Sequence, residues 1–302
     1  MGSKAVLLLA FGGADSPENV EPFVKNVLKG RPVTPDLIER AKERYALIGG
    51  KSPLLEITTA QAKAIEGLLK KAGLDFKVYI GMRYWHPFIK DTLKRMKDDG
   101  VTDAVTLIMA PFTSKVAAGG YLADIEEAKK LIENPPRLEF ILDWHVRPQF
   151  IDIIIEKMQE AMSGLERKDA LVIFSCHSLP MALLEGDAYE MKIQQTAGEI
   201  ARKAPVDYRI AYQSKGSGPR DWLGPATEDV IAQAKIAGKE SVVVVPLGFA
   251  ADHVETLYDI DILFKETAES LGLIFKRSAS LNTAPKFMEL IAGLIKKNSG
   301  VN

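Results

Sequence analysis

The chain has 302 residues and a formal net charge of −1 at pH 7, with 39 Lys and Arg residues against 40 Asp and Glu residues. This length predicts about two domains, each large enough to bury an ordinary core. The balanced charge gives no support to a nucleic-acid-binding protein or to a basic membrane tether. The single cysteine, Cys176, excludes an intrachain disulfide, a cysteine-ligated zinc site and a protein-ligated iron–sulfur cluster.

The first apolar run, residues 6–11, is too short for the apolar region of a signal peptide and lacks a small-residue cleavage pattern. It is better explained as a buried strand. No segment has the roughly 18 consecutive apolar residues that a transmembrane helix requires. We therefore expect a cytoplasmic protein in a reducing compartment, and peripheral contact with a membrane stays open.

Eight apolar, β-rich runs alternate with segments of helical spacing. The runs are 5–10, 76–82, 104–110, 138–144, 170–175, 208–212, 241–246 and 273–276. Continuous apolar strands that alternate with helices are typical of parallel sheets with both faces covered. Each half of the chain repeats the order strand, long excursion, strand, helix, strand, helix, strand. The pattern predicts an α/β protein with two similar doubly wound domains, each with a four-stranded parallel sheet flanked by helices.

We expect the domains to be 1–147 and 148–302, because a strand gives way to Arg147-Pro148 and a new helix near this point. The first domain carries a long insertion, 12–75, directly after its first strand. Helical spacing in this insertion predicts helices near 18–28, 36–47 and 54–71. An insertion of this size predicts a lip over a binding site.

Two of the four histidines, His177 and His253, follow strands of the second half. In facing parallel sheets, ligands bind outside the carboxyl ends of the strands, so these positions favour a site. Pro180 prevents the strand from continuing after His177. The resulting turn would hold the imidazole over the cleft between the two facing domains. A hydrogen-bonded structural histidine explains either position equally well, so both interpretations stay open.

An acidic helix begins beside His253. Asp252 and Glu255 have the spacing of an N-cap and its capping partner, so a well-started helix with a solvated acidic face is one interpretation. It explains Asp259 less well, because carboxylates at i and i+4 repel unless a proton or cation lies between them. His177 and this acidic row together predict proton handling and a transiently bound divalent cation, since no zinc-binding spacing is present.

Two other classes of site lack their motifs. Gly12-Gly13 is without the remaining glycines of a dinucleotide fingerprint, and no phosphate-binding loop occurs. Ser178 adjoins His177 but is not part of a nucleophile elbow, and adjacency in sequence is not triad geometry. Neither nucleotide binding nor serine hydrolysis is supported.

Six motifs resemble, in order along the chain, those of the ferrochelatase family, which inserts ferrous iron into a porphyrin. They are IGGKSPL at 48–54, GMRYWHP at 81–87, SCHSLP at 175–180, YQSK at 212–215, WLGP at 222–225 and PLGFAADHVETLYD at 246–259. The resemblance extends from residue 5 to about residue 290. It implies two Rossmann-like, chelatase-type domains with a porphyrin cleft between them, in agreement with the strand-end argument.

The resemblance also implies which residues react. His177 would lie at the centre of the porphyrin and either accept the pyrrole protons or ligate the iron, and the sequence leaves both roles open. Glu255 would transfer protons and contact the metal. Asp252, His253 and Asp259 would support this pair or extend a proton or metal relay.

The implied substrate-binding residues come mainly from the first half. They are Phe11, Tyr45, Ser52, Arg83, Tyr84 and Trp222. Arg83 is expected to pair with a propionate or to position the ring. Porphyrin and ferrous iron are the expected partners, with Fe²⁺ as a substrate, no permanent cofactor and no nucleic acid, while the oligomeric state is not indicated.

Two positions depart from the family pattern. Phe11 stands where coproporphyrin-type bacterial relatives place a tyrosine whose oxygen approaches the metal. Leu263 stands where many relatives place a third carboxylate, so the relay is shortened unless Asp261 or Glu266 substitutes in a locally widened helix.

Two further functions remain as alternatives. One is a cobalt or nickel chelatase for another tetrapyrrole, and the other is a non-catalytic haem- or porphyrin-binding protein. The motifs around His177 and Glu255 favour a ferrochelatase that acts on protoporphyrin IX or coproporphyrin III in haem biosynthesis.

Overall fold

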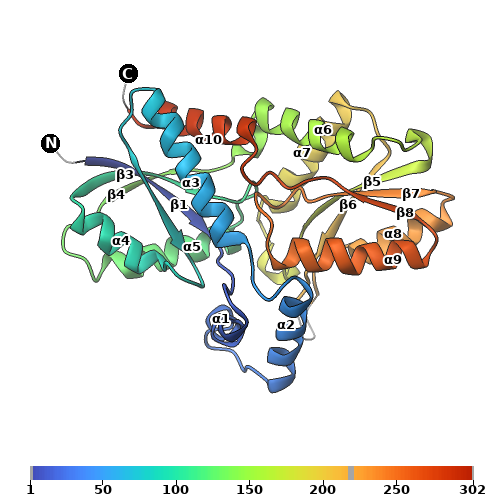
Figure 1. Cartoon of the computed structure of the whole chain (residues 1–302), viewed down its shortest axis with the longest axis horizontal. Coiled ribbons are helices and arrows are strands. Elements are labelled where there is room, and N and C mark those ends of the chain that lie inside the picture. The colour runs from blue at the N-terminus through green and yellow to red at the C-terminus, as the bar shows by residue number, and fades with distance from the viewer. Residues whose placement is uncertain (1–2, 217–220, 301–302) are drawn as a thin grey trace.

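The computed structural model describes residues 3–216 and 221–300 and has two lobes side by side, each built on one parallel sheet (Figure 1). The first sheet has the order β2-β1-β3-β4 and the second the order β6-β5-β7-β8. The strands are β1 Ser3–Ala10, β2 Lys77–Met82, β3 Val101–Ile108, β4 Arg137–Ile141, β5 Ala170–His177, β6 Tyr208–Gln213, β7 Ser241–Val245 and β8 Ile274–Arg277. The predicted fold class and four-stranded sheets are confirmed.

Both faces of each sheet are buried, as continuous apolar strands predict. In β1, Val6 and Leu8 face one apolar cluster, while Leu7 and Leu9 face another on the opposite side of the sheet. All four side chains are fully buried, and each contributes about 1.5–3 kcal/mol by leaving water. The cluster on the Val6 side continues into the second lobe as far as Phe174 of β5, so the lobes share one core.

Helices cover these faces and also form the insertion. The helices are α1 Val20–Val27, α2 Pro35–Leu47, α3 Leu54–Lys71, α4 Ile89–Asp98, α5 Lys115–Lys129, α6 Pro148–Ala161, α7 Tyr189–Lys203, α8 Thr227–Ile236, the π-helix η5 Glu255–Phe264, α9 Lys265–Ser270 and α10 Pro285–Asn298. Short 3₁₀ turns lie at Pro17–Asn19, Trp144–Val146, Arg167–Asp169 and Met181–Leu183. The three helices expected in the insertion are confirmed, and α1 and α2 lie below the two sheets in Figure 1. Among the described residues, no helix is long and apolar enough to cross a membrane.

Most strand boundaries differ from the sequence prediction by one to three residues, and two of these differences change the local structure. The strand expected at 138–144 ends at Ile141, because Asp143 adopts a left-handed backbone with φ of 56° and Trp144 turns into the core. The strand expected at 170–175 continues to His177, which pairs with Gln213 of β6. This second difference makes His177 the last residue of a central strand.

The expected division at 147 and 148 separates the two sheets, but the last helix crosses it. Helix α10 contacts α3 of the first lobe as well as α6 of the second, and it lies along the top of Figure 1. Lys4 of β1 donates a hydrogen bond of 2.7 Å to the carbonyl of Ser299, just beyond α10. The boundary at 147 and 148 therefore divides the two sheets, but α10 contacts both lobes, and the division into two domains stays a prediction.

Candidate active site

His177 lies at the carboxyl end of β5 and faces Glu255. Its Nε2 is 3.3 Å from Oε1 of Glu255, and its Nδ1 contacts the carbonyl of Ser178. A carbonyl only accepts, so Nδ1 carries a proton, and one further proton lies between Nε2 and the Glu255 carboxylate when the pair is in contact. The strand end thus presents an imidazole and a carboxylate that share a proton.

The backbone around His177 is held on both sides. The hydroxyl of Tyr189, on α7, donates to the carbonyl of His177 at 3.0 Å, and burial raises the pKa of this phenol, so that it keeps its proton. The hydroxyl of Ser178 donates to the carbonyl of Leu223 at 2.7 Å. Fixed main-chain contacts of this kind keep the imidazole in one place.

Glu255 opens the π-helix η5 between two imidazoles. Its Oε2 is 3.3 Å from Nε2 of His253, and its main-chain carbonyl accepts a 2.9 Å hydrogen bond from Gln213. Burial raises the pKa of Glu255, but the two histidines outweigh this effect and hold the pKa below its ordinary value. Burial lowers the pKa of His177 in turn, and the Glu255 carboxylate outweighs it and raises the pKa. At neutral pH the pair is an imidazolium and a carboxylate.

Asp259 lies one turn further along η5 and is 4% exposed. Its carboxylate accepts a hydrogen bond from the hydroxyl of Ser214. Burial and then the Glu255 carboxylate raise the pKa of Asp259 to about 6, although Ser214 and Arg44 oppose the shift. The repulsion predicted between carboxylates at i and i+4 therefore favours a proton on Asp259 up to a pH of about 6.

The expectation that Asp252 caps this helix is wrong. No side chain caps η5, and the Asp252 carboxylate instead accepts hydrogen bonds from Arg277, Ser280 and Asn282. The charged guanidinium forms a stronger bond than a helix N–H, which explains the difference. His253 is held by the hydroxyl of Thr256, which accepts its main-chain N–H at 3.0 Å.

The helix is locally widened, yet neither substitute carboxylate joins Glu255 and Asp259. Asp261 is bound to Arg277, with Oδ2 2.7 Å from Nη1. Glu266 is exposed on α9, and Leu263 packs against the core of the second lobe. The carboxylates that lie close together on this helix are therefore Glu255 and Asp259, and their action as a relay stays a prediction.

Phe11, Arg83 and Tyr84, which the resemblance implies as substrate-binding residues, lie at the ends of β1 and β2 in the first lobe. The Phe11 ring is 42% exposed and its centroid lies 4.6 Å from that of Tyr84. The Arg83 guanidinium lies over the rings of Tyr84 and Tyr121, at 4.7 and 5.5 Å from their centroids. Its Nε donates to Asp124 at 2.9 Å, so Arg83 is held against α5, and its pairing with a propionate stays a prediction.

Tyr45 and Ser52 support the lip from inside. The Tyr45 hydroxyl accepts the main-chain N–H of Ala14 at 3.1 Å, and the Ser52 N–H donates to the carbonyl of Ala14 at 2.8 Å. Both side chains are buried, and a Cβ on Gly13 would collide with Ser52, so the segment after β1 packs tightly on the lip. Their role as substrate-binding residues stays a prediction.

Trp222 is partly buried beside the turn after β5. It forms an isolated β-bridge with Pro180, and its ring lies so close to Gly216 that a Cβ there would collide with it. Residues 217–220 of the neighbouring loop lie outside the described residues.

Two contacting residues, Tyr189 and Arg277, were not singled out from the sequence and carry no motif. Gln213 and Ser214 belong to the YQSK motif at 212–215. Arg277 ends β8, so applying the strand-end rule to the last strand would have found it.

Two other features bear on a metal site. Within the described ranges, no group of three or more His, Cys, Asp or Glu side chains is arranged to hold a metal ion.

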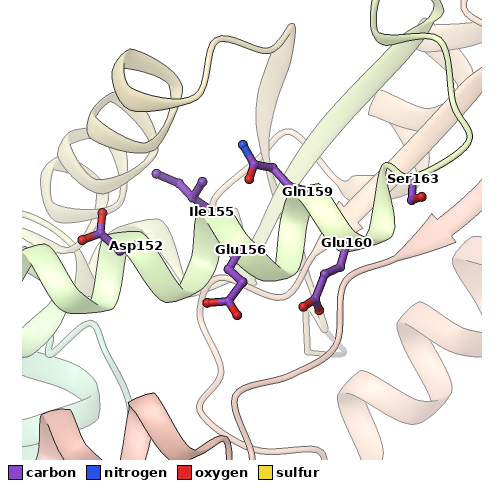
Figure 2. Close-up of a pocket in the computed structure, with 6 residues that line it drawn as sticks. All are labelled: Asp152, Ile155, Glu156, Gln159, Glu160 and Ser163. Atoms are coloured by element: carbon purple, nitrogen blue, oxygen red, sulfur yellow. The ribbon is translucent and has the colours of Figure 1, made fainter.

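A surface pocket of about 480 Å³ lies elsewhere, along α6 and the turn after it (Figure 2). It is lined by Asp152, Ile155, Glu156, Gln159, Glu160 and Ser163. His177 and Glu255 do not line this pocket, and their two-residue contact suits a transient metal better than a caged one.

Solved structures with the same fold include SirB and CbiX. SirB from Bacillus subtilis with Fe³⁺ aligns with a TM-score of 0.61 at 12% identity and covers 99% of this chain and 96% of that chain. CbiX, described as the terminal enzyme for biosynthesis of sirohaem in denitrifying bacteria, aligns with a TM-score of 0.56 at 14% identity, over 99% of this chain and 100% of that chain. At these identities the comparison defines the fold, which is that of the chelatase class.

Sequence relatives define the family more narrowly. Residues 3–299 match the ferrochelatase family model. A protein named coproporphyrin III ferrochelatase from Halalkalibacterium halodurans is 36% identical over 97% of this chain and 96% of its own length. A protein named ferrochelatase from Herpetosiphon aurantiacus is also 36% identical, over 96% of this chain and 97% of its own length. The chain belongs to the ferrochelatase family, the metal-inserting lyases that place iron in a porphyrin during haem biosynthesis.

Proposed function

We propose that this chain inserts Fe²⁺ into its porphyrin at the His177–Glu255 pair. The carrying observation is the 3.3 Å contact between Nε2 and Oε1 at the carboxyl end of β5. Insertion releases two pyrrole protons and strips water from Fe²⁺, so the site needs a base and a ligand beside the ring. An imidazole and a carboxylate supply both once the proton that they share has left.

The resting pair must lose its shared proton before His177 can act as a base or as an iron ligand, because only neutral imidazole does either. Glu255 is the first acceptor, and His253 and Asp259 lie beyond it on the same segment. A pKa of about 6 lets Asp259 take a proton and pass it on near neutral pH. We therefore assign the outward proton route to Glu255, Asp259 and their neighbour His253.

The porphyrin would lie between the two lobes, with His177 and Trp222 on one side and Phe11, Arg83 and Tyr84 on the other. Planar aromatic and apolar walls suit a porphyrin face. Phe11 supplies such a wall without a hydroxyl, so it leaves His177 and Glu255 as the groups that approach the metal.

We choose coproporphyrin III as the first substrate to test, because relatives at 36 and 37% identity are named for it. Fe²⁺ is consumed as a substrate, and the proposal includes no permanent cofactor. It also includes a cytoplasmic location, which suits a chain whose one cysteine is buried and unpaired.

The test is an anaerobic assay in which purified protein is mixed with Fe²⁺ and either coproporphyrin III or protoporphyrin IX. Absorption bands of the free and metallated porphyrin report turnover. We expect repeated turnover with one of the two. Parallel reactions with Co²⁺ and Ni²⁺ measure metal preference. Stoichiometric porphyrin binding without turnover would overturn the proposal and leave a binding protein.

A further inference from the structure

Arg277, the last residue of β8, lies between two carboxylates of the segment that carries Glu255. Its Nη1 is 2.7 Å from Oδ2 of Asp261, and its Nη2 contacts Oδ1 of Asp252. The Arg277 side chain is 14% exposed. Asp252 precedes Glu255 by three residues and Asp261 follows it by six, so one guanidinium holds both sides of the turn that presents Glu255.

Three further hydrogen bonds hold Asp252 at its end of this contact. Ser280 donates to Oδ1 of Asp252 at 2.6 Å, and Asn282 donates to Oδ2 at 2.7 Å. The side-chain oxygen of Asn282 accepts the main-chain N–H of Asp252 at 2.8 Å. These contacts come from the loop after β8, so they fix Asp252 to that loop.

The fixed carboxylate is connected to the reactive turn through Thr256. The Thr256 hydroxyl lies 3.3 Å from Oδ1 of Asp252 and accepts the His253 N–H at 3.0 Å. Thr256 is fully buried. A shift of Asp252 would therefore move His253 and the first turn of η5, and Glu255 with it.

The same loop is tied to the first lobe by Gln61 of α3. Its side-chain nitrogen donates to the carbonyl of Asn282 at 2.7 Å, and the residue is fully buried. The Arg277 contacts are thus continuous with a contact between the lobes.

A planar guanidinium suits this position because its fork reaches two carboxylates at once, which an ammonium does not do with the same geometry. A π-helix is rare and occurs mostly as a short bulge inside an α-helix, so contacts from outside the helix help to hold η5 in this form. Both carboxylates are paired with Arg277 rather than with Glu255 or Asp259.

We propose that Arg277 is a positioning residue for metal insertion. Its fork sets the position of Glu255 against His177 and keeps Asp252 and Asp261 out of the relay. The inference rests on the proposed role of the His177–Glu255 pair.

The test compares Arg277→Lys, which keeps the charge but loses the fork, with Arg202→Lys. Arg202 makes an exposed ion pair with Glu199 on α7 and is the matched control. We expect Arg277→Lys to lower kcat per porphyrin-binding site by about 10-fold or more, with less than about a two-fold change in the porphyrin KM, because small misplacement of a reacting group acts on the chemical step. Porphyrin titration counts the folded sites. Arg202→Lys is expected to match wild type in both constants.

Wild-type kcat in folded Arg277→Lys would overturn the inference while leaving the proposed function intact. Equal loss of total activity and of porphyrin-binding sites would also overturn it, because kcat per site is then unchanged and the loss is a folding effect. Should Arg277→Lys not fold, Asp261→Asn tests the same fork from its more exposed side. We expect a lower kcat at unchanged KM, and wild-type kcat would contradict the inference. Failure of the proposed function is separate, because it requires unchanged turnover in His177→Ala or Glu255→Gln.

Discussion

His177 owes its chemistry to its position as the last residue of β5, where the strand stops and the ring meets Glu255. Replacing His177 with Ala removes the imidazole without touching the Tyr189 hydrogen bond to the main chain. We expect kcat to fall about 100-fold or more, the usual scale for a lost acid–base group. Anaerobic turnover on folded protein, checked by porphyrin binding, is the measurement. Near-normal turnover would show that His177 is not the reacting group.

Asp259 couples the site to pH. Burial and the Glu255 carboxylate raise its pKa to about 6, above the unfolded value near 4. A raised carboxyl pKa stabilises the fold at low pH, and this stabilisation is lost as pH rises through about 6. At about 1.4 kcal/mol per pKa unit, ionising Asp259 costs ~2–3 kcal/mol.

Asp259→Asn removes this cost. Relative to wild type, the variant is therefore expected to gain stability between pH 4 and pH 8 while losing turnover. Urea unfolding at the two pH values tests the first part, and an equal stability difference at both would contradict the assigned pKa.

Helix α7 connects the two lobes through Lys192. Its ammonium contacts the Asp143 carboxylate at 2.5 Å and the Thr113 hydroxyl at 3.1 Å. Burial raises the pKa of Asp143, but Lys192 and Thr113 outweigh it and lower the pKa. The contact therefore stabilises the fold above the ordinary carboxyl pKa and is lost as pH falls below it.

We expect Asp143→Asn to be less stable than wild type at pH 7 and to lose less stability between pH 5 and pH 3. Asp152→Asn is the control, because Asp152 makes an exposed pair with Lys203. Thermal melts between pH 3 and pH 7 measure the stability of wild type and of both variants. Parallel curves for Asp143→Asn and wild type would show that the contact contributes nothing.

The elements also show how far the sequence carries a prediction. Apolar runs and helical spacing predict all eight strands and the helices of the lip, because periodicity reports burial directly. The strand expected at 138–144 stops early, since a left-handed Asp143 depends on tertiary contacts that no local pattern reports. Motifs find His177 and Glu255, but Arg277 and Tyr189 act through neighbours distant in sequence, which only the folded chain brings together.

One apolar cluster is shared between the two lobes and joins them across the whole molecule. Ile291 of α10 is fully buried in the cluster that extends from β1 to β7. Ile291→Ala should cost about 2–5 kcal/mol and lower the stability of both lobes in a single unfolding transition. Urea unfolding followed by tryptophan fluorescence and circular dichroism measures this. Two separate transitions, only one of them shifted, would mean that the lobes fold independently.

In the proposed reaction, the two lobes present a porphyrin to the reacting pair His177 and Glu255. The decisive measurement compares the kcat of Glu255→Gln with that of Glu269→Gln, since Glu269 is an exposed glutamate on α9. We expect Glu255→Gln to lose about 100-fold or more in kcat at similar porphyrin affinity, while Glu269→Gln keeps wild-type turnover. Equal turnover in the two variants would show that Glu255 does not take part in the reaction.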